Sequence, residues 1–147
     1  MQKFDMIIDA SGLILGRMAS FVAKNLLNGK KVAIINCEKA VISGEKHAIL
    51  QRYFKRRGRK TMSNPRRGPF FYTMPDRIVW RTIRGMIPWD KKKGRDAMKR
   101  LKVFIGVPKE LKNAKPIDLP EKYKCTKLMC DYLTVEELSK ELRGGFI

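Results

Sequence analysis

The segment VAIIN at residues 32–36 constrains the fold most, because it is a continuous apolar run that is only as long as a strand. Such a run is typical of a strand that is covered on both faces, as in a parallel sheet. Residues 4–10 form a similar segment, and residues 15–27 have the apolar spacing of a helix, which Asn28 and Gly29 end. Strand, helix and strand in this order predict a βαβ unit, in which a right-handed crossover joins two parallel strands.

The middle of the chain predicts shorter elements. An extended piece at residues 40–42 precedes a helix that opens at residues 43–45 and continues toward residue 54. Residues 76–87 predict another helix, which should end before Pro88 because the residue before a proline is kept out of the α region. A second short helix is expected from Arg95, followed by a strand at residues 102–105.

The last part of the chain, residues 108–147, is expected to be an extended segment followed by a helix. Residues 107–133 contain Pro108, Pro116 and Pro120, whereas TVEE at residues 134–137 has the form of a capping box that starts a short amphipathic helix. The sequence therefore predicts an α/β fold in a single domain, residues 1–147. It should contain a small, largely parallel sheet with helices on both faces, plus a long basic loop.

Positive charge is concentrated in one part of the chain. The net charge is +19, and residues 46–102 alone hold 19 basic and 3 acidic side chains, a net charge of +16. A charge of this size opposes the folding of an isolated chain and favours binding to an anion, either nucleic acid or an anionic membrane surface. We therefore expect the partner to contact residues 46–102, and the two ends to supply ordinary fold surface.

Helical spacing separates charged from apolar side chains in residues 76–87. Arg77, Arg81 and Arg84 recur at i, i+4 and i+7, opposite a stripe that contains Ile78, Val79, Thr82, Ile83 and Met86. Like charges at this spacing repel one another by roughly a few tenths of a kcal/mol per pair, and an external polyanion would relieve that repulsion. The following helix should likewise turn Ala97, Met98 and Leu101 inward, and Arg95, Lys99 and Lys102 outward.

Residues 55–75 predict a long loop, with three Pro, two Gly, seven Lys or Arg and no acidic residue. A structureless loop of this length is usually functional, or disordered until it is bound. Aromatic side chains are interleaved with the charges of residues 46–102, and Arg and aromatic side chains stack on unpaired bases while Arg also pairs with phosphate. A merely solvated charged face is the usual explanation of a charge run, but the 19 to 3 imbalance favours polyanion binding here.

Other motifs are incomplete. Gly12 and Gly16 lie between a strand and a helix but match neither the dinucleotide fingerprint nor the P-loop, which favours a tight turn with close packing. Cys125 and Cys130 lack the second ligand pair of a structural zinc site, and His47 has no nucleophile motif beside it. We therefore expect free thiols, no metal, no cofactor and no catalytic residue. No segment reaches the ~18 consecutive apolar residues of a membrane span, which predicts a cytosolic protein.

Several separated blocks carry a family signature: IDA at 8–10, LGRMAS at 15–20, INCE at 35–38, VISG at 41–44, RTIRGMIP at 81–88, KGRDA at 93–97, LKVF at 101–104 and GVP at 106–108. Together they resemble the large-subunit ribosomal protein family numbered thirteen over roughly the first three quarters of the chain. The family usually has alanine where this chain has Cys37. The chain resembles an archaeal member, because it has neither a long C-terminal extension nor a His- and Gly-rich insert.

The resemblance implies a structural, non-enzymatic component of the large ribosomal subunit, cytoplasmic in the ribosome. Its partners would be large-subunit ribosomal RNA and neighbouring ribosomal proteins, with no membrane and no small-molecule substrate. The residues expected to bind RNA are Arg52, Lys55, Arg56, Arg57, Arg59, Lys60, Arg66, Arg67, Arg77, Arg81, Arg84, Lys91, Lys92, Lys93, Arg95 and Lys99. The alternative is a nucleic-acid-processing enzyme with a Rossmann-like core, which would need clustered acids or a nucleotide-binding loop. A peripheral membrane protein would need a lipid-facing apolar face beside the basic one.

Overall fold

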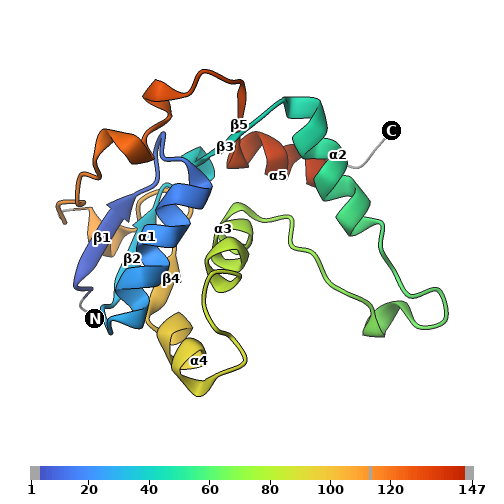
Figure 1. The fold of residues 1–147 in the computed structure, drawn as a ribbon, viewed down its shortest axis with the longest axis horizontal. Coiled ribbons are helices and arrows are strands. Elements are labelled where there is room, and N and C mark those ends of the chain that lie inside the picture. The colour runs from blue at the N-terminus through green and yellow to red at the C-terminus, as the bar shows by residue number, and fades with distance from the viewer. Residues whose placement is uncertain (1–3, 113, 145–147) are drawn as a thin grey trace.

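The computed structural model describes residues 4–112 and 114–144 of the chain (Figure 1). Its strands and α-helices, in chain order, are β1 (Met6–Asp9), α1 (Leu15–Leu27), β2 (Val32–Ile35), β3 (Val41–Ser43), α2 (Lys46–Arg57), α3 (Pro75–Arg84), α4 (Lys92–Lys99), β4 (Leu101–Val103), β5 (Tyr132–Thr134) and α5 (Val135–Gly144). Short 3-10 helices lie between them: η1 (Cys37–Lys39), η2 (Pro65–Arg67), η3 (Lys109–Leu111), η4 (Glu121–Tyr123) and η5 (Cys125–Lys127).

A three-stranded parallel sheet in the order β1-β2-β4 forms the centre of the fold. All four residues of β2 are buried because it is the middle strand, which agrees with the apolar run in the sequence. Met6 is in register with Val32, and Val32 in turn with Leu101. The predicted βαβ unit is therefore confirmed, and β4 extends the sheet on the far side of β2.

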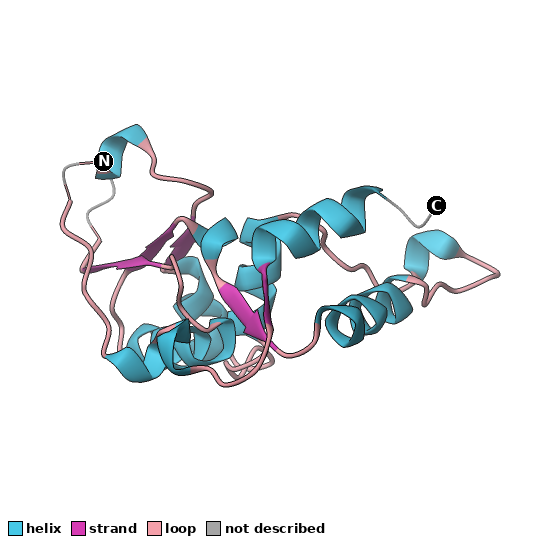
Figure 2. Ribbon diagram, turned by 90° about the horizontal axis from the view of Figure 1, so that it is seen from above, coloured by secondary structure: helices cyan, strands magenta, loops and turns pink. Residues whose placement is uncertain are grey.

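The two faces of this sheet are covered by different segments. Ile8 and Ile34 point into the main core with residues from α1, α3 and α4, among them Met18 and Ile83. On the opposite face, Ala33 and Ile35 pack against Leu111 of η3. Figure 2 shows helices on one side of the sheet and a loop-rich segment on the other. The predicted α/β class and the small, largely parallel sheet are confirmed, but the α-helices cover one face, and the other face is covered by the segment that contains η3.

A second, two-stranded sheet pairs β3 with β5 in antiparallel fashion. The helix that follows β5, α5, packs against α2, α3 and η1. Its start has the predicted cap, because the backbone N–H of Glu137 donates to Thr134 Oγ1 at 3.2 Å. The C-terminal third of the chain thus returns to hold α2 and α3 in place.

Several boundaries differ from the sequence-based prediction. The helix α2 continues through Arg57 and so takes the first three residues of the predicted loop, and α4 begins at Lys92 rather than near Arg95. The segment at residues 107–133 contains three 3-10 helices rather than being extended throughout. The helix that starts after the predicted capping box, α5, ends at Gly144, and residues 145–147 lie outside the described residues.

The end of α3 also differs, because the position of Pro88 predicts a helix that continues to residue 87. The helix ends at Arg84 with Gly85 as its cap, so Met86 leaves the helical periodicity. Met86 is 42% exposed, whereas Ile87 takes the buried position that follows. The prediction that Met86 faces the core is therefore wrong, because its backbone is already in the turn that leads to Pro88.

Candidate nucleic-acid interface

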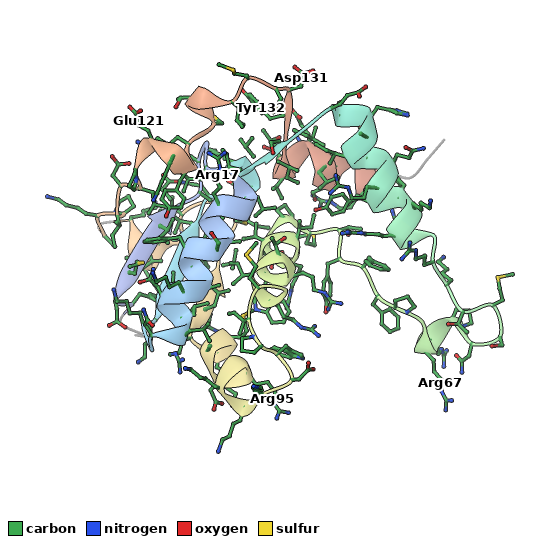
Figure 3. The ribbon with its side chains drawn as sticks, in the orientation of Figure 1. Arg17, Arg67, Arg95, Glu121, Asp131 and Tyr132 are labelled. Carbon is green, nitrogen blue, oxygen red and sulfur yellow. The ribbon has the colours of Figure 1, made fainter. Side chains whose placement is uncertain are left out.

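The basic residues of the central region lie on three separate surfaces. The first is the arm, which we define as α2 together with residues 58–74, and which reaches away from the body of the protein (Figure 1). The second is the outer face of α3, and the third is α4 with the turn before it. Figure 3 shows Arg67 at the far end of the arm and Arg95 on α4, well apart from each other. The tip of the arm and α4 therefore point at different regions of space.

The arm carries cations along α2 and at its tip. Lys55, Arg56 and Arg57 occupy the last turn of α2, where the helix dipole favours positive charge. Four more predicted residues, which are Arg59, Lys60, Arg66 and Arg67, lie beyond the helix and are all exposed. A short turn orders part of the tip, because Asn64 Oδ1 accepts from the backbone N–H of Arg66 at 3.2 Å. The tip is thus an exposed cluster of cations.

One predicted residue of the arm also anchors it to the body. The Arg57 guanidinium donates to the backbone carbonyl of Leu142, near the C-terminal end of α5. This bond satisfies a carbonyl that the end of a helix leaves without an intrahelical partner. The base of the arm is therefore fixed to the last helix of the chain.

The outer faces of α3 and α4 are accessible. Arg77 and Arg81 are exposed, as are the predicted residues of the α4 surface: Lys91, Lys92, Lys93, Arg95 and Lys99. Two acidic residues hold neighbouring cations in this region, since Asp76 lies 3.7 Å from Arg77 Nε and Asp96 lies 3.2 Å from Lys99 Nζ. Each of these aspartates therefore orients one basic side chain on the same helix.

Arg84 differs from the other arginines of α3, because it is half-buried between two tryptophans. Its guanidinium carbon lies 4.4 Å from the ring centroid of Trp89 and 5.9 Å from that of Trp80. The two indoles meet edge to face, with centroids 6.1 Å apart and planes at 76°. Such cation–π contacts fix the plane of the guanidinium. Arg84 therefore holds α3 to the turn before α4 as well as contributing charge.

A groove of about 670 Å³ lies where the arm meets the body. It is lined by residues from the start of α1, from β3, α2 and α3, and from residues 70–73, where the arm returns toward α3. The arginines that line it are Arg17, Arg52, Arg56, Arg57 and Arg81. None of the residues that line the groove in the described part of the chain is acidic. The groove is therefore a strongly positive concavity.

The groove brings together four of the predicted residues and one that sequence analysis missed. Arg52, Arg56, Arg57 and Arg81 come from two helices that are far apart in sequence. Arg17 was not predicted, because it lies in the nearly neutral N-terminal segment, on the outer face of α1 (Figure 3). Its guanidinium donates to the backbone carbonyl of Lys122 at 2.6 Å. The sequence signal for Arg17 was its position on the outer face of the helix predicted at residues 15–27.

The remaining polar groups at the sheet serve the fold. Burial acts to raise the pKa of Asp9, but hydrogen bonds from Asn36 and Ser11 outweigh it, so the net shift is downward. Burial and the nearby carboxylates of Glu38 and Asp76 raise the pKa of the Cys37 thiol to about 12, which keeps it protonated and inert. No group of three or more His, Cys, Asp or Glu side chains in residues 4–112 and 114–144 is arranged to hold a metal ion.

The glycine turn after β1 is likewise occupied by the protein itself. Gly12 has a φ of 67°, and its backbone N–H donates to Lys39 O at 3.2 Å while its carbonyl accepts from Cys125 N at 2.9 Å. The first of these bonds uses the backbone N–H that a phosphate-binding loop would offer to a ligand. The interpretation of Gly12 as a structural turn is therefore confirmed. Among the described residues, no helix has both the length and the apolar composition needed to cross a bilayer.

Comparison with known proteins gives the same family as the sequence blocks did. Residues 4–110 match the family model described as Ribosomal protein L13. The chain is 48% identical to the large ribosomal subunit protein uL13 of Methanocaldococcus jannaschii, over 95% of this chain and 98% of that protein. It is 45% identical to the uL13 of Methanosarcina barkeri, over 95% and 99% of the two chains. The match to the uL13 of Archaeoglobus fulgidus has 50% identity over 71% of this chain and 65% of that protein.

These relatives are archaeal, in agreement with the archaeal type that the sequence resembles. The family match covers β1 through η3, so it includes the sheet, the arm, α3 and α4. It therefore covers all three basic surfaces described above. The chain belongs to the ribosomal protein L13 family.

Proposed function

We propose that this protein is a structural component of the large ribosomal subunit, without catalytic activity, that binds ribosomal RNA through the arm, α3 and α4. Family membership supports the ribosomal role, since the relatives are named large ribosomal subunit proteins. One observation carries the RNA-binding part: the predicted cations, apart from the half-buried Arg84, are exposed on the arm, α3 and α4, and few carboxylates lie near them. The weakly charged C-terminal segment, together with the N-terminal one, would face neighbouring ribosomal proteins or solvent.

The spacing of the three surfaces suggests how the protein acts. Lys and Arg neutralise phosphates and release condensed counterions, which supplies most of the affinity of such an interface. Because the arm tip and α4 are well separated (Figure 3), one protein molecule contacts RNA segments that are themselves separate. Neutralising the phosphates of converging RNA helices lets those helices approach one another. The protein thus stabilises a junction in the folded RNA.

The salt dependence of binding tests this function. In a filter-binding titration with large-subunit ribosomal RNA, log affinity should fall linearly with log salt concentration, with a slope of several units, because each neutralised phosphate contributes roughly 0.7–0.9. Replacing Arg66 and Arg67 by Gln at the arm tip should reduce that slope by about 1–2. A control pair, Lys24→Gln with Lys30→Gln near the end of α1, lies outside the three surfaces and should leave it unchanged. A flat salt dependence would contradict the proposal.

A further inference from the structure

The groove between the arm and the body has the size of a ligand site. Its volume of about 670 Å³ lies within the ~300–1,000 Å³ that is usual for small-molecule and cofactor sites. Its floor is apolar, and includes the buried side chains of Ile14, Leu15 and Ile78. A floor of this kind is suited to a flat, apolar group rather than to a hydrated ion.

The walls of the groove add two further properties. Phe71 and Tyr72 line it and remain 39% and 42% exposed, so their rings have free surface for a ligand to cover. Tyr53 lines it from α2, and burial raises the pKa of its hydroxyl, which therefore stays protonated at neutral pH. Arg52, Arg56 and Arg81 complete the lining, and no carboxylate opposes them there in the described residues. The groove thus combines aromatic surface with uncompensated positive charge.

The ligand that matches these walls has a flat aromatic part and an anionic part. An unpaired nucleotide has both, because its base stacks on aromatic or guanidinium planes and its phosphate pairs with arginine. A base inside an RNA duplex is already stacked and cannot reach the aromatic walls of a concavity, whereas a bulged base can be turned outward. An acidic peptide would satisfy the arginines but would leave the exposed rings uncovered.

We propose that this groove takes one unpaired nucleotide, extruded from a helix of the bound RNA, and this inference rests on the proposed function. The base lies against Phe71 and Tyr72 on the apolar floor, and its phosphate lies at the arginines from α2 and α3. The arm and the body then grip the same nucleotide from two sides. The groove therefore recognises one unpaired nucleotide of the RNA, whereas the three basic surfaces bind the RNA backbone.

The test uses the full chain and three short RNA duplexes that differ at one position. The first is fully paired, the second carries a single bulged adenosine, and the third carries an abasic residue at the bulge, which keeps the bend and the phosphate but removes the base. We expect the adenosine bulge to bind about 5- to 100-fold more tightly than either of the others, the range expected for stacking one base. Fluorescence anisotropy at a fixed salt concentration measures all three affinities.

Variants assign that preference to the groove. Tyr72→Leu and Phe71→Leu should each reduce the preference for the adenosine bulge, with affinity for the paired duplex retained. A matched control is Tyr132→Leu on β5, which is 52% exposed and lies outside the groove, and it should keep the full preference (Figure 3). Arg66→Gln at the arm tip should weaken binding to all three RNAs equally. Thermal melts of each variant establish that it is folded.

The outcomes separate this inference from the function on which it rests. Equal affinity for the three RNAs, or loss of the preference in Tyr132→Leu but not in the groove variants, overturns the groove assignment and leaves RNA binding in place. Failure to bind any of them even at low salt overturns the proposed function itself. If free adenosine monophosphate binds the groove as tightly as the bulged RNA does, the ligand is a mononucleotide and the inference is wrong.

Discussion

Among the described glycines, Gly94 is the one at which an added Cβ atom would come closest to other backbone atoms. A Cβ atom at this position would lie 2.0 Å from the carbonyl oxygen of Pro88 and 3.1 Å from Ile87 Cγ2. The neighbouring atom is main chain, so it cannot turn aside as the end of a side chain could. Gly94 lies in the first turn of α4, and its lack of a side chain allows that turn to pack on the segment that follows α3.

We therefore expect Gly94→Ala to lower the free energy of unfolding by at least the ~1–3 kcal/mol typical of overpacking a core. The matched control is Gly16→Ala in α1, where a Cβ would meet nothing within 4 Å. In that exposed helical position alanine should be neutral, or stabilising by roughly 0.5–1 kcal/mol. Denaturant unfolding of both variants measures the difference. If Gly94→Ala unfolds at the same midpoint as Gly16→Ala, α4 does not pack on Pro88 as described.

Cys37 supplies a second prediction at this scale, through its protonation. The pKa of its thiol is about 12 in the folded protein, against an ordinary value of 9.0, because the side chain is buried beside Glu38 and Asp76. Below pH 9 the thiol is protonated in both states and its contribution to stability is fully present. Between these two values the unfolded chain releases the proton while the folded chain keeps it, so stability falls by about 1.4 kcal/mol per pH unit from this group.

Replacing Cys37 by alanine, the residue that the family usually has, removes this contribution. The free energy of unfolding should decline less steeply between pH 9 and 11 in Cys37→Ala than in the parent. Lysines and tyrosines titrate in the same range, but they are common to both proteins, so the comparison isolates the thiol. Cys130→Ala is the control, because Cys130 is exposed and its replacement should leave the slope unaltered. Identical slopes for all three proteins would refute the assignment.

At the scale of elements, α3 has two faces with different tasks. Ile78, Val79 and Ile83 are buried in the main core, whereas Arg77 and Arg81 are exposed on the other side. Arg84 belongs to neither group alone, because its guanidinium is stacked on Trp80 and Trp89. The helix thus has an apolar face packed in the core and a basic face exposed to solvent, with a stacked arginine at its C-terminal end.

The two sides should respond oppositely to substitution. Arg77→Gln with Arg81→Gln should leave stability unchanged or slightly raised, because like-charge repulsion is removed, and should weaken RNA binding. Ile83→Ala should cost ~2–5 kcal/mol of stability, since its side chain is fully buried, with little change in the RNA affinity of the folded protein. Arg84→Gln should weaken RNA binding and also lower the stability by roughly 0.5–2 kcal/mol, because the cation–π contacts are lost. Thermal melts beside RNA-binding curves check each variant. If the double arginine variant is destabilised while Ile83→Ala melts like the parent protein, the assignment of the two faces of α3 is wrong.

Elements were predictable from sequence where a single local signal decides them. The bounds of α1 follow from its apolar spacing and from the Asn28-Gly29 stop, and they match the structure. The end of α3 was not predicted correctly, because Pro88 sets only the last residue that the helix could reach and Gly85 ends it earlier. The groove was not predictable either. Arg17, Arg52 and Phe71 come together only through tertiary packing, which no local periodicity encodes.

The whole molecule carries its charge unevenly, and this has a measurable effect on the free protein. The net charge is +19, and the part that the structure describes has few carboxylates near the arm, α3 and α4. Self-repulsion of this kind destabilises a compact state, and salt screens it, because the Debye length shortens from ~10 Å at 0.1 M to ~3 Å at 1 M.

The melting temperature of the isolated protein should therefore rise as sodium chloride is increased from 0.1 M to 1 M. The variant with Arg77→Gln and Arg81→Gln should show a smaller rise, because part of the repulsion is already gone. Scanning calorimetry or circular dichroism melts provide the measurement. A melting temperature that falls with salt in the parent would mean that attractive ion pairs outweigh repulsion in the fold.

The pairing of β3 with β5 links two segments that the ribosome making this chain synthesises far apart in time. The three-stranded sheet is complete once Val103 has been made, but Val41–Ser43 must wait for Tyr132–Thr134 before it is paired. The anchor of Arg57 waits longer still, for Leu142. A nascent chain can thus form its three-stranded sheet early, while the base of its arm is not anchored until Leu142 has been made. The arm, which carries many of the cations proposed to bind RNA, is therefore the last of these parts to be fixed to the body.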